Sequence, residues 1–366
     1  MKVIVIHKNK LTNMPPVISA ILNLLELGHE VVLIDNEVDD YWHHRLEATG
    51  VRIYEIPSSG RTFLGKLKDY YIFRKSVFSI LKKEMRDANN SLLWVEGANT
   101  IVSLGTQIKK YKYVLQILEL HEGSKFQLRA IDKVIHDAKA VFIPEYNRAC
   151  IYQVWFNLRQ RPYVLPNKPY FLPTTDELTN ISKKYQDILL KLKDKKILLY
   201  QGGISMTRML DQIAQANINI GRRFQLLLVG PEQDKNTISK IQAIDNTAIH
   251  IPFLPAPDYL VFTSIAYIGY VCYKPTSLNN LYCAPNKINE FSAFSVPMLG
   301  NDIPGLKYIF QETGSGVIAD TSNVKDIMNK LEYIDENYDA LKKNAYNIYA
   351  YSDNVATIQS VLQRIN

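Results

Sequence analysis

The chain has 366 residues, of which 47% are hydrophobic and 22% charged; this is typical of a soluble globular protein and excludes a long disordered chain. Its three cysteines form no C-x-x-C pair, so no disulfide framework is expected. We therefore expect a reducing, cytoplasmic compartment. The formal net charge is +7, and residues 1–170 carry the whole surplus, with 24 Lys+Arg against 17 Asp+Glu.

Short apolar runs alternate with helical patterns along the first half. Residues 3–6 form an apolar strand, a helix begins at Pro15-Pro16 and ends before Gly28, and residues 30–34 form the next strand. This strand–helix–strand order is the unit of a parallel sheet, so we expect a doubly wound α/β domain. Further strands are expected at residues 51–56, 92–95, 113–118, 140–143 and 163–165.

The proline-rich segment 166–173 marks the expected domain boundary, and the same alternation resumes after it. The expected domains are residues 1–170, residues 171–348 and a helix at 349–366 that packs back on the first domain. We expect helices at 176–193, 323–338 and 338–365, and strands at 196–200, 224–229, 250–254, 268–273, 296–299 and 316–319.

The segment 284–300, A-P-N-K-I-N-E-F-S-A-F-S-V-P-M-L-G, predicts a loop, a short helix and a buried strand. Lys287 lies at the start of this helix, and a helix N-terminus that carries a lysine is a natural phosphate site. Glu290 follows on the same surface and can accept hydrogen bonds from hydroxyls, so the pair suggests a nucleotide with a ribose. The alternative is a surface helix with an ion pair between these two residues.

A second candidate element follows the strand 196–200. Gly202 and Gly203 allow a close approach of the backbone to a ligand, and Arg208 can hold a diphosphate with paired donors. A tight turn with a surface arginine is the alternative, because a double glycine alone is weak evidence. Its position relative to Lys287 and Glu290 strengthens the first interpretation.

Residues 196–366 resemble the C-terminal, nucleotide-sugar-binding domain of GT-B glycosyltransferases, above all the retaining family four (group 1) enzymes of bacterial polysaccharide assembly. The resemblance rests on four motifs in order: L-Y-Q-G-G at 199–203 with Arg208, L-V-G-P at 228–231, the turn at 251–254 followed by D-Y-L, and P-N-K-I-N-E at 285–290 before V-P-M-L. It implies two Rossmann-like domains that face each other across a cleft. L-P-N at 165–167 and the aromatic segment 349–352 resemble the end of the first domain and the returning helix.

The resemblance also implies roles for matched residues. Glu290 would bind the ribose hydroxyls, Leu254 would offer backbone atoms to the base, and Arg208 and Lys287 would neutralise the leaving diphosphate. His121, in E-L-H-E after a strand, resembles the histidine near the transferred sugar; a hydrogen-bonded loop histidine is the alternative. The implied catalytic residues are His121, Arg208 and Lys287, and the donor-binding residues are Gly202, Gly203, Gly230, Leu254, Tyr282, Asn286 and Glu290.

Two departures from the family pattern keep other functions open. Tyr282 stands where the family carries a second glutamate, and H-K-N-K at 7–10 replaces its first glycine-rich loop. An inverting enzyme, a non-catalytic GT-B scaffold subunit and a nucleotide-sugar epimerase are therefore alternatives. The chain has no D-x-D, so no metal and no cofactor are expected beyond a UDP- or GDP-sugar donor.

The basic segment 61–86 predicts an amphipathic helix, with eight basic and two acidic residues beside an apolar, aromatic stripe. Such a helix can lie on an anionic membrane surface, so a peripheral position on the inner face of the cell membrane is one expectation. A core-packed helix with a solvated face is the alternative. No nucleic-acid signature accompanies the charge. The expected acceptor is a saccharide, lipid-linked in the simplest case.

Overall fold

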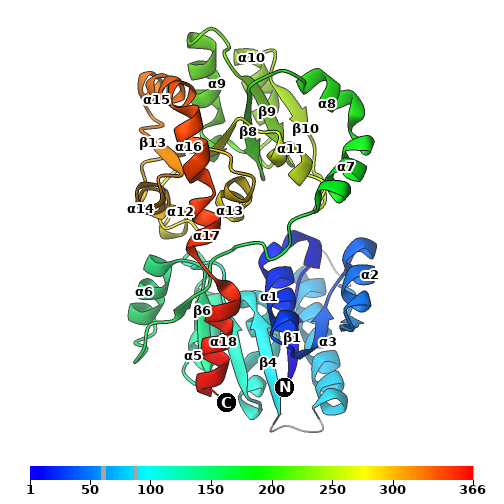
Figure 1. Cartoon of the computed structure of the whole chain (residues 1–366). Coiled ribbons are helices and arrows are strands. Elements are labelled where there is room, and N and C mark those ends of the chain that lie inside the picture. The colour runs from blue at the N-terminus through cyan, green and yellow to red at the C-terminus, as the bar shows by residue number, and fades with distance from the viewer. Residues whose placement is uncertain (59–62, 86–89, 366) are drawn as a thin grey trace. The chain divides into compact units, whose positions relative to one another are not determined.

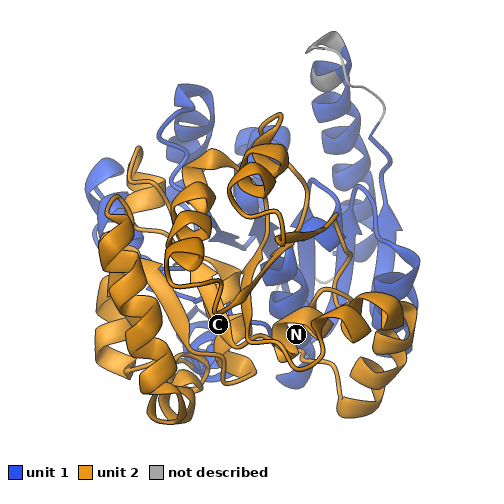
Figure 2. Cartoon of the chain, turned by 90° about the horizontal axis from the view of Figure 1, so that it is seen from above, with its two compact units in different colours: residues 1–170, 353–366 blue, residues 171–352 orange. Residues whose placement is uncertain are grey.

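The computed structural model describes residues 1–58, 63–85 and 90–365. The chain divides into two compact units, shown in different colours in Figure 2. The first unit contains residues 1–170 and 353–366, and the second contains residues 171–352.

The described part of the first unit is built on a seven-stranded parallel sheet in the order β3-β2-β1-β4-β5-β6-β7 (Figure 1). The order reverses at β1, so β1 and β4 flank the switch point of a doubly wound sheet. The strands are β1 (Lys2–His7), β2 (Glu30–Asp35), β3 (Arg52–Glu55), β4 (Ser91–Glu96), β5 (Tyr113–Gln116), β6 (Ala140–Ile143) and β7 (Tyr163–Val164). The helices are α1 (Pro15–Glu26), α2 (Asp40–Ala48), α3 (Phe63–Glu84), α4 (Gly97–Leu104), α5 (Lys125–Ile135), α6 (Tyr146–Trp155) and α18 (Asn354–Ile365), with 3-10 turns η1 (Leu11–Asn13) and η2 (Gly105–Lys110).

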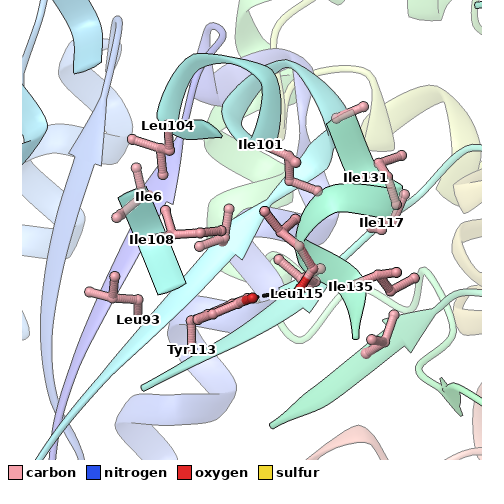
Figure 3. Packing of buried hydrophobic residues seen from close by; sticks show 14 of the residues in the cluster. Ile6, Leu93, Ile101, Leu104, Ile108, Tyr113, Leu115, Ile117, Ile131 and Ile135 are labelled. Carbon is pink, nitrogen blue, oxygen red and sulfur yellow. Dashed lines mark hydrogen bonds between the residues drawn. The ribbon is translucent and has the colours of Figure 1, made fainter. Parts of the chain in front are cut away.

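One face of this sheet packs against α3, α4 and α5 through an aliphatic core (Figure 3). Ile6, Leu93 and Leu115 point from three neighbouring strands into this core, where Ile101 and Ile131 meet them from the helices. Because successive strand residues alternate between faces, the continuous apolar runs of β1, β4 and β5 fit a sheet covered on both sides.

The second unit repeats this topology with a six-stranded parallel sheet in the order β10-β9-β8-β11-β12-β13, so β8 and β11 flank its switch point. Its strands are β8 (Ile197–Gln201), β9 (Gln225–Val229), β10 (Ile249–Ile251), β11 (Ile268–Val271), β12 (Met298–Asn301) and β13 (Gly316–Ala319). Its helices are α7 (Thr175–Lys184), α8 (Gln186–Leu192), α9 (Leu210–Asn219), α10 (Thr237–Ile244), α11 (Leu260–Ser264), α12 (Leu278–Leu281), α13 (Asn286–Ala293), α14 (Pro304–Thr313), α15 (Val324–Glu336), α16 (Tyr338–Ala345) and α17 (Asn347–Tyr351), with the 3-10 turn η3 (Met206–Arg208).

Strand β8 shows why this sheet is buried on both faces. Leu198 and Tyr200 belong to the core under α9 and α15, whereas Ile197 and Leu199 belong to the core under α11, α13 and α14. All four side chains are at most 2% exposed. The strand therefore ends, at Gln201, in the middle of the sheet between two helix layers, which is where doubly wound sheets bind ligands.

Several expected elements have different bounds in the structure, and three of the differences have a clear physical cause. The helix expected at 176–193 is two helices, because Tyr185 leaves the helical conformation and its hydroxyl donates to Asp258. The strand expected at 250–254 ends at Ile251, since Pro252 cannot donate to a sheet ladder. The helix expected at 338–365 is three helices, and the segment in the first unit begins at 353 rather than 349 because α17 packs against α13 and α14.

Helix α3 buries only part of the stripe expected for the segment 61–86. Phe73, Val77 and Leu81 are buried in the core, whereas the side chains of Leu67 and Tyr71 are 51% and 66% exposed. The ends of that segment, at Arg61 and Arg86, lie outside the described residues. In the part of the chain that the structure describes, no helix has the length and apolar character needed to cross a bilayer.

Candidate functional site

Two glycine turns bring backbone segments together at the carboxyl ends of β8 and β9. Gly202 follows β8 with φ +116°, and Gly230 follows β9 with φ +140°, a backbone region that side chains rarely adopt. A Cβ on Gly230 would lie 2.1 Å from the Gly202 carbonyl oxygen. A Cβ on Gly202 would lie 3.2 Å from Lys287 Nζ, so the missing side chain leaves room beside the lysine.

We expect Gly230→Ala to lower the free energy of unfolding by about 3 kcal/mol or more, because the new methyl group meets backbone at a strained φ. Gly221→Ala is the matched control: its φ is +78°, but nothing lies within 4 Å of the added Cβ. That variant should lose only about 1 kcal/mol of conformational strain. Urea midpoints of the two variants measure the difference, and equal midpoints would contradict the close approach.

Lys287 is a buried cation without an anionic partner. It lies at the second position of α13, and it is 9% exposed. Its Nζ lies 4.3 Å from the centre of the Tyr200 ring and 5.6 Å from that of Tyr273. No carboxylate among the described residues is within ion-pair distance of it. Burial, with a further contribution from Arg208, lowers the pKa of Lys287 to about 7.

Arg208 provides a second cation beside it. It ends the 3-10 turn η3, and its guanidinium lies 4.1 Å from the centre of the same Tyr273 ring. Its Nε and Nη1 are buried and have no hydrogen-bond partner in the described structure. Buried donors and charges are normally satisfied, so these orphaned donors and the unpaired lysine indicate a binding site for an anion.

The carboxylate of Glu290 lies one helical turn after Lys287 and is 6% exposed. Its Oε1 accepts a 2.6 Å hydrogen bond from the Tyr259 hydroxyl, and its Oε2 accepts a 2.5 Å bond from Gln201 Nε2. Burial raises the pKa of Glu290. Lys287 and Glu290 are thus both buried and form no direct ion pair, so the alternative of an exposed, ion-paired surface helix is wrong.

The remaining predicted residues of the second unit lie around the same edge of the sheet. A Cβ on Gly203 would meet the end of the exposed Gln233 side chain, which can move, so this position does not require glycine as Gly202 and Gly230 do. Leu254 follows β10 and packs on the core below it. Asn286 is the first residue of α13, and Tyr282 ends α12; both are half-buried.

His121 belongs to the first unit, in the loop between β5 and α5 at the carboxyl edge of that sheet. Its φ is +59°, which is uncommon for a residue with a side chain, and its carbonyl accepts the Ser124 amide at 2.8 Å. Burial lowers its pKa, and a hydrogen bond with Gln127 opposes this shift. His121 thus has the contacts expected of a hydrogen-bonded loop histidine. Its catalytic role stays a proposal.

Four residues that contact the site in the second unit were not predicted: Tyr273, Gln201, Tyr259 and Thr263. The Tyr273 ring is near both cations, Gln201 and Tyr259 donate to Glu290, and Thr263 donates to Gln201. Gln201 and Tyr273 stand at or just after the carboxyl ends of β8 and β11, the strands at the switch point. Gln201 and Tyr259 also lie within the L-Y-Q-G-G and D-Y-L motifs, whereas Tyr273 had only its position after a strand, and Thr263, inside α11, had no signal in the sequence.

Comparisons with known proteins bear on the fold. No protein-family model matches the sequence. No curated protein matches it either. Among solved structures, HepE from Anabaena in complex with UDP and glucose matches with a TM-score of 0.72 and 13% identity, over 100% of this chain and 99% of that one.

Two further structures cover nearly the whole of both chains. WaaG, a glycosyltransferase involved in lipopolysaccharide biosynthesis, matches with a TM-score of 0.64 and 12% identity, over 100% of each chain. A protein assigned as a UDP-N-acetylglucosamine 2-epimerase, from Listeria monocytogenes, matches with a TM-score of 0.62 and 16% identity, over 98% of this chain and 94% of that one. At these identities the likeness concerns the fold. The prediction of two Rossmann-like units is confirmed: the chain has the GT-B fold.

Proposed function

We propose that this protein is a glycosyltransferase that moves a sugar from a nucleotide-sugar to a saccharide acceptor. The observation that carries the proposal is a pair of cations, Arg208 and Lys287, that have no anionic partner among the described residues and lie at the switch point of the second sheet. A diphosphate would satisfy both. As the bond between sugar and diphosphate breaks, negative charge grows on the leaving nucleotide, and fixed cations stabilise that charge more than they stabilise the intact donor.

The other predicted residues take the roles that the resemblance implies. Glu290 binds the ribose, Leu254 offers backbone atoms to the base, and Gly202, Gly203 and Gly230 allow the nucleotide to approach the backbone. Asn286 and Tyr282 complete the donor-binding residues. His121 is the proposed catalytic residue of the first unit. UDP is the first nucleotide to test, because HepE was solved with UDP and UDP-glucose.

Several finer features of the proposal come from the family resemblance. They are a lipid-linked acceptor, retention of the anomeric configuration, transfer without a metal, and a place in capsule, O-antigen or exopolysaccharide synthesis. Tyr282, in the position of the family's second glutamate, makes retention the feature to measure directly, by the anomeric configuration of the product. The proposed location is cytoplasmic, with peripheral contact to the inner face of the membrane.

Nucleotide binding is the most direct test of the proposal. UDP, GDP, ADP, dTDP and CMP are added separately to the wild type, to Glu290→Ala and to the exposed control Glu312→Ala, and melting temperatures are recorded. A ligand at about 100 times its Kd stabilises the folded state by about 2.7 kcal/mol. We expect one nucleotide to stabilise the wild type and the control but not Glu290→Ala. If no nucleotide stabilises the wild type, the donor site is refuted and a scaffold subunit becomes the better proposal.

A nucleotide-sugar 2-epimerase is the second candidate, because such a protein is among the structures with the same fold. The reaction products distinguish the two. A transferase releases nucleoside diphosphate in proportion to acceptor consumed, whereas an epimerase converts one nucleotide-sugar into its isomer without an acceptor. Nucleotide-sugar incubated with the enzyme alone, then separated by chromatography, decides between them.

Helix α3 offers a surface for the proposed membrane contact. Lys68, Lys75, Lys82 and Lys83 are exposed on it, as are the apolar side chains of Leu67 and Tyr71. We expect the protein to float with vesicles that contain an anionic lipid and not with neutral vesicles. Lys68→Glu with Lys75→Glu should weaken this binding by about 10-fold or more, since each basic residue near such a surface contributes about 1 kcal/mol. Lys342→Glu with Lys343→Glu, the same charge change on α16, is the control; equal effects would refute a specific role of α3.

A further inference from the structure

The buried Glu290 carboxylate accepts one hydrogen bond from a described side chain on each of its two oxygens. An ionised carboxylate has about four lone-pair positions, two on each oxygen. Tyr259 occupies one position on Oε1, at 2.6 Å, and Gln201 occupies one on Oε2, at 2.5 Å. These are the hydrogen bonds that Glu290 makes to described residues, so one position on each oxygen stays available. Two acceptor positions on neighbouring oxygens match two hydroxyl groups on adjacent carbons.

A second layer fixes the orientation of Gln201. The Thr263 hydroxyl donates to Gln201 Oε1 at 2.7 Å, so the amide must present its NH2 group to Glu290. Gln201 is 4% exposed and Thr263 is 0% exposed, so water does not compete for these bonds. The carboxylate is therefore oriented before a ligand arrives, and orientation in advance reduces the entropy lost on binding.

Tyr259 connects the carboxylate to the loop 252–258, which contains Leu254. It is the N-cap of α11 and directly follows that loop. On the other side of the same junction, Asp258 accepts a 2.7 Å hydrogen bond from the Tyr185 hydroxyl. The end of the loop is thus held at two points: at Glu290 by Tyr259, and at α7 and α8 by Asp258.

We propose that Tyr259 and Gln201 are positioning residues that direct Glu290 at a vicinal pair of hydroxyls, so that the site selects ribonucleotides over 2′-deoxyribonucleotides. Tyr259 also couples this selection to the loop proposed to bind the base. This inference rests on the proposed function and extends it to the class of nucleotide. A site built to accept a hydroxyl discriminates against a ligand that lacks it, because the buried acceptor is left unpaired.

The test compares UDP with 2′-deoxy-UDP by titration calorimetry. We expect the wild type to bind UDP about 10- to 100-fold more tightly, the range for one hydrogen bond to a charged group. Tyr259→Phe removes only the hydroxyl and should weaken UDP binding by about 10-fold. It should weaken 2′-deoxy-UDP binding less, since that ligand has already lost one contact, so the ratio of the two Kd values falls. A general loss of stability would weaken both ligands equally and leave this ratio unchanged.

Tyr267→Phe is the matched control, because it also removes a tyrosine hydroxyl from a carboxylate of the same unit, that of Asp335, and Tyr267 lies before the amino end of β11. It should keep the wild-type ratio. Thr263→Val removes the hydroxyl that orients Gln201 and should lower the ratio of the two Kd values by a smaller factor. If Tyr259→Phe does not fold, Thr263→Val serves as the test in its place. A wild-type ratio in a folded Tyr259→Phe that still binds UDP overturns the inference and leaves the proposed function standing. Failure of the wild type to bind UDP or any other nucleotide refutes both.

Discussion

Lys287→Met is expected to raise the melting temperature of the ligand-free protein and to lower its affinity for UDP by about 10- to 100-fold. The two effects have one cause. Lys287 lies close to the Tyr200 and Tyr273 rings, with no carboxylate of the described residues in ion-pair contact, so its charge has lost water without gaining an anion there. Methionine has similar length and no charge, and such replacements of buried ions often stabilise a protein by about 1–2 kcal/mol.

The same substitution removes a cation that the diphosphate needs. Lys287 is thus expected to lower the stability of the ligand-free protein and to raise the affinity for the nucleotide. This combination is typical of a binding site and not of a core position. Thermal melting and titration calorimetry measure the two effects separately. Lys307→Met is the control, because Lys307, on α14, has a side chain that is 40% exposed and forms a 3.0 Å ion pair with Asp302. It should change neither quantity appreciably.

Two results would contradict this interpretation of Lys287. If Lys287→Met binds UDP like the wild type, the lysine does not contact the nucleotide. If it lowers the melting temperature as a truncated core residue does, the lysine serves mainly to pack the Tyr200 and Tyr273 rings. For a unit of this size, about 1 kcal/mol corresponds to a shift of roughly 2–4 °C, which melting experiments resolve readily.

The affinity for UDP is expected to fall as the pH rises from 7 to 9, by up to about 50-fold if only the charged lysine binds well. The pKa of Lys287 is lowered to about 7, so about half of the molecules carry the charge at pH 7 and about one in a hundred at pH 9. The phosphate groups of UDP are already largely ionised above pH 7 and do not produce this trend. A bound diphosphate raises the pKa of the lysine, which moves the midpoint of the decline upward.

The stability of the empty protein should change in the opposite direction. The pKa of Lys287 is about 7 in the folded protein and near 10.5 in the unfolded chain, so between these values the unfolded chain holds more protons. The contribution of Lys287 to the free energy of unfolding therefore rises with pH across this window.

The neighbouring Cys272 thiol does not produce these trends between pH 7 and 9, because burial raises its pKa above the ordinary value of 9.0. Calorimetric titrations at several pH values on the wild type and on Lys287→Met isolate the lysine. A slope that persists in Lys287→Met would assign the pH dependence to another group.

The sequence by itself determined the fold. Most of the described strands are short runs of apolar residues, because a strand covered on both faces must be apolar on both; the edge strand β3, R-I-Y-E, is the exception that shows the rule applies to the inner strands. Prolines and glycines punctuate these runs, so the order of strands and helices could be predicted. Helix ends were predicted less well, because a break such as that at Tyr185 comes from a hydrogen bond to Asp258, distant in sequence.

Lys287, Glu290, Arg208 and the glycines of the candidate site were recognisable from spacing and resemblance, because each stands at the end of a predicted strand or the start of a helix. The burial of these residues and their contacts with one another could not be predicted in this way. Only the tertiary structure brings Tyr273 close to both Arg208 and Lys287 and buries the lysine with no anion among the described residues. It alone joins Gln201 to Glu290, 89 positions along the chain. Burial and hydrogen bonding between residues distant in sequence depend on how the sheet brings its strand ends together. A local sequence pattern shows which residues stand at those ends, but not which of them are in contact.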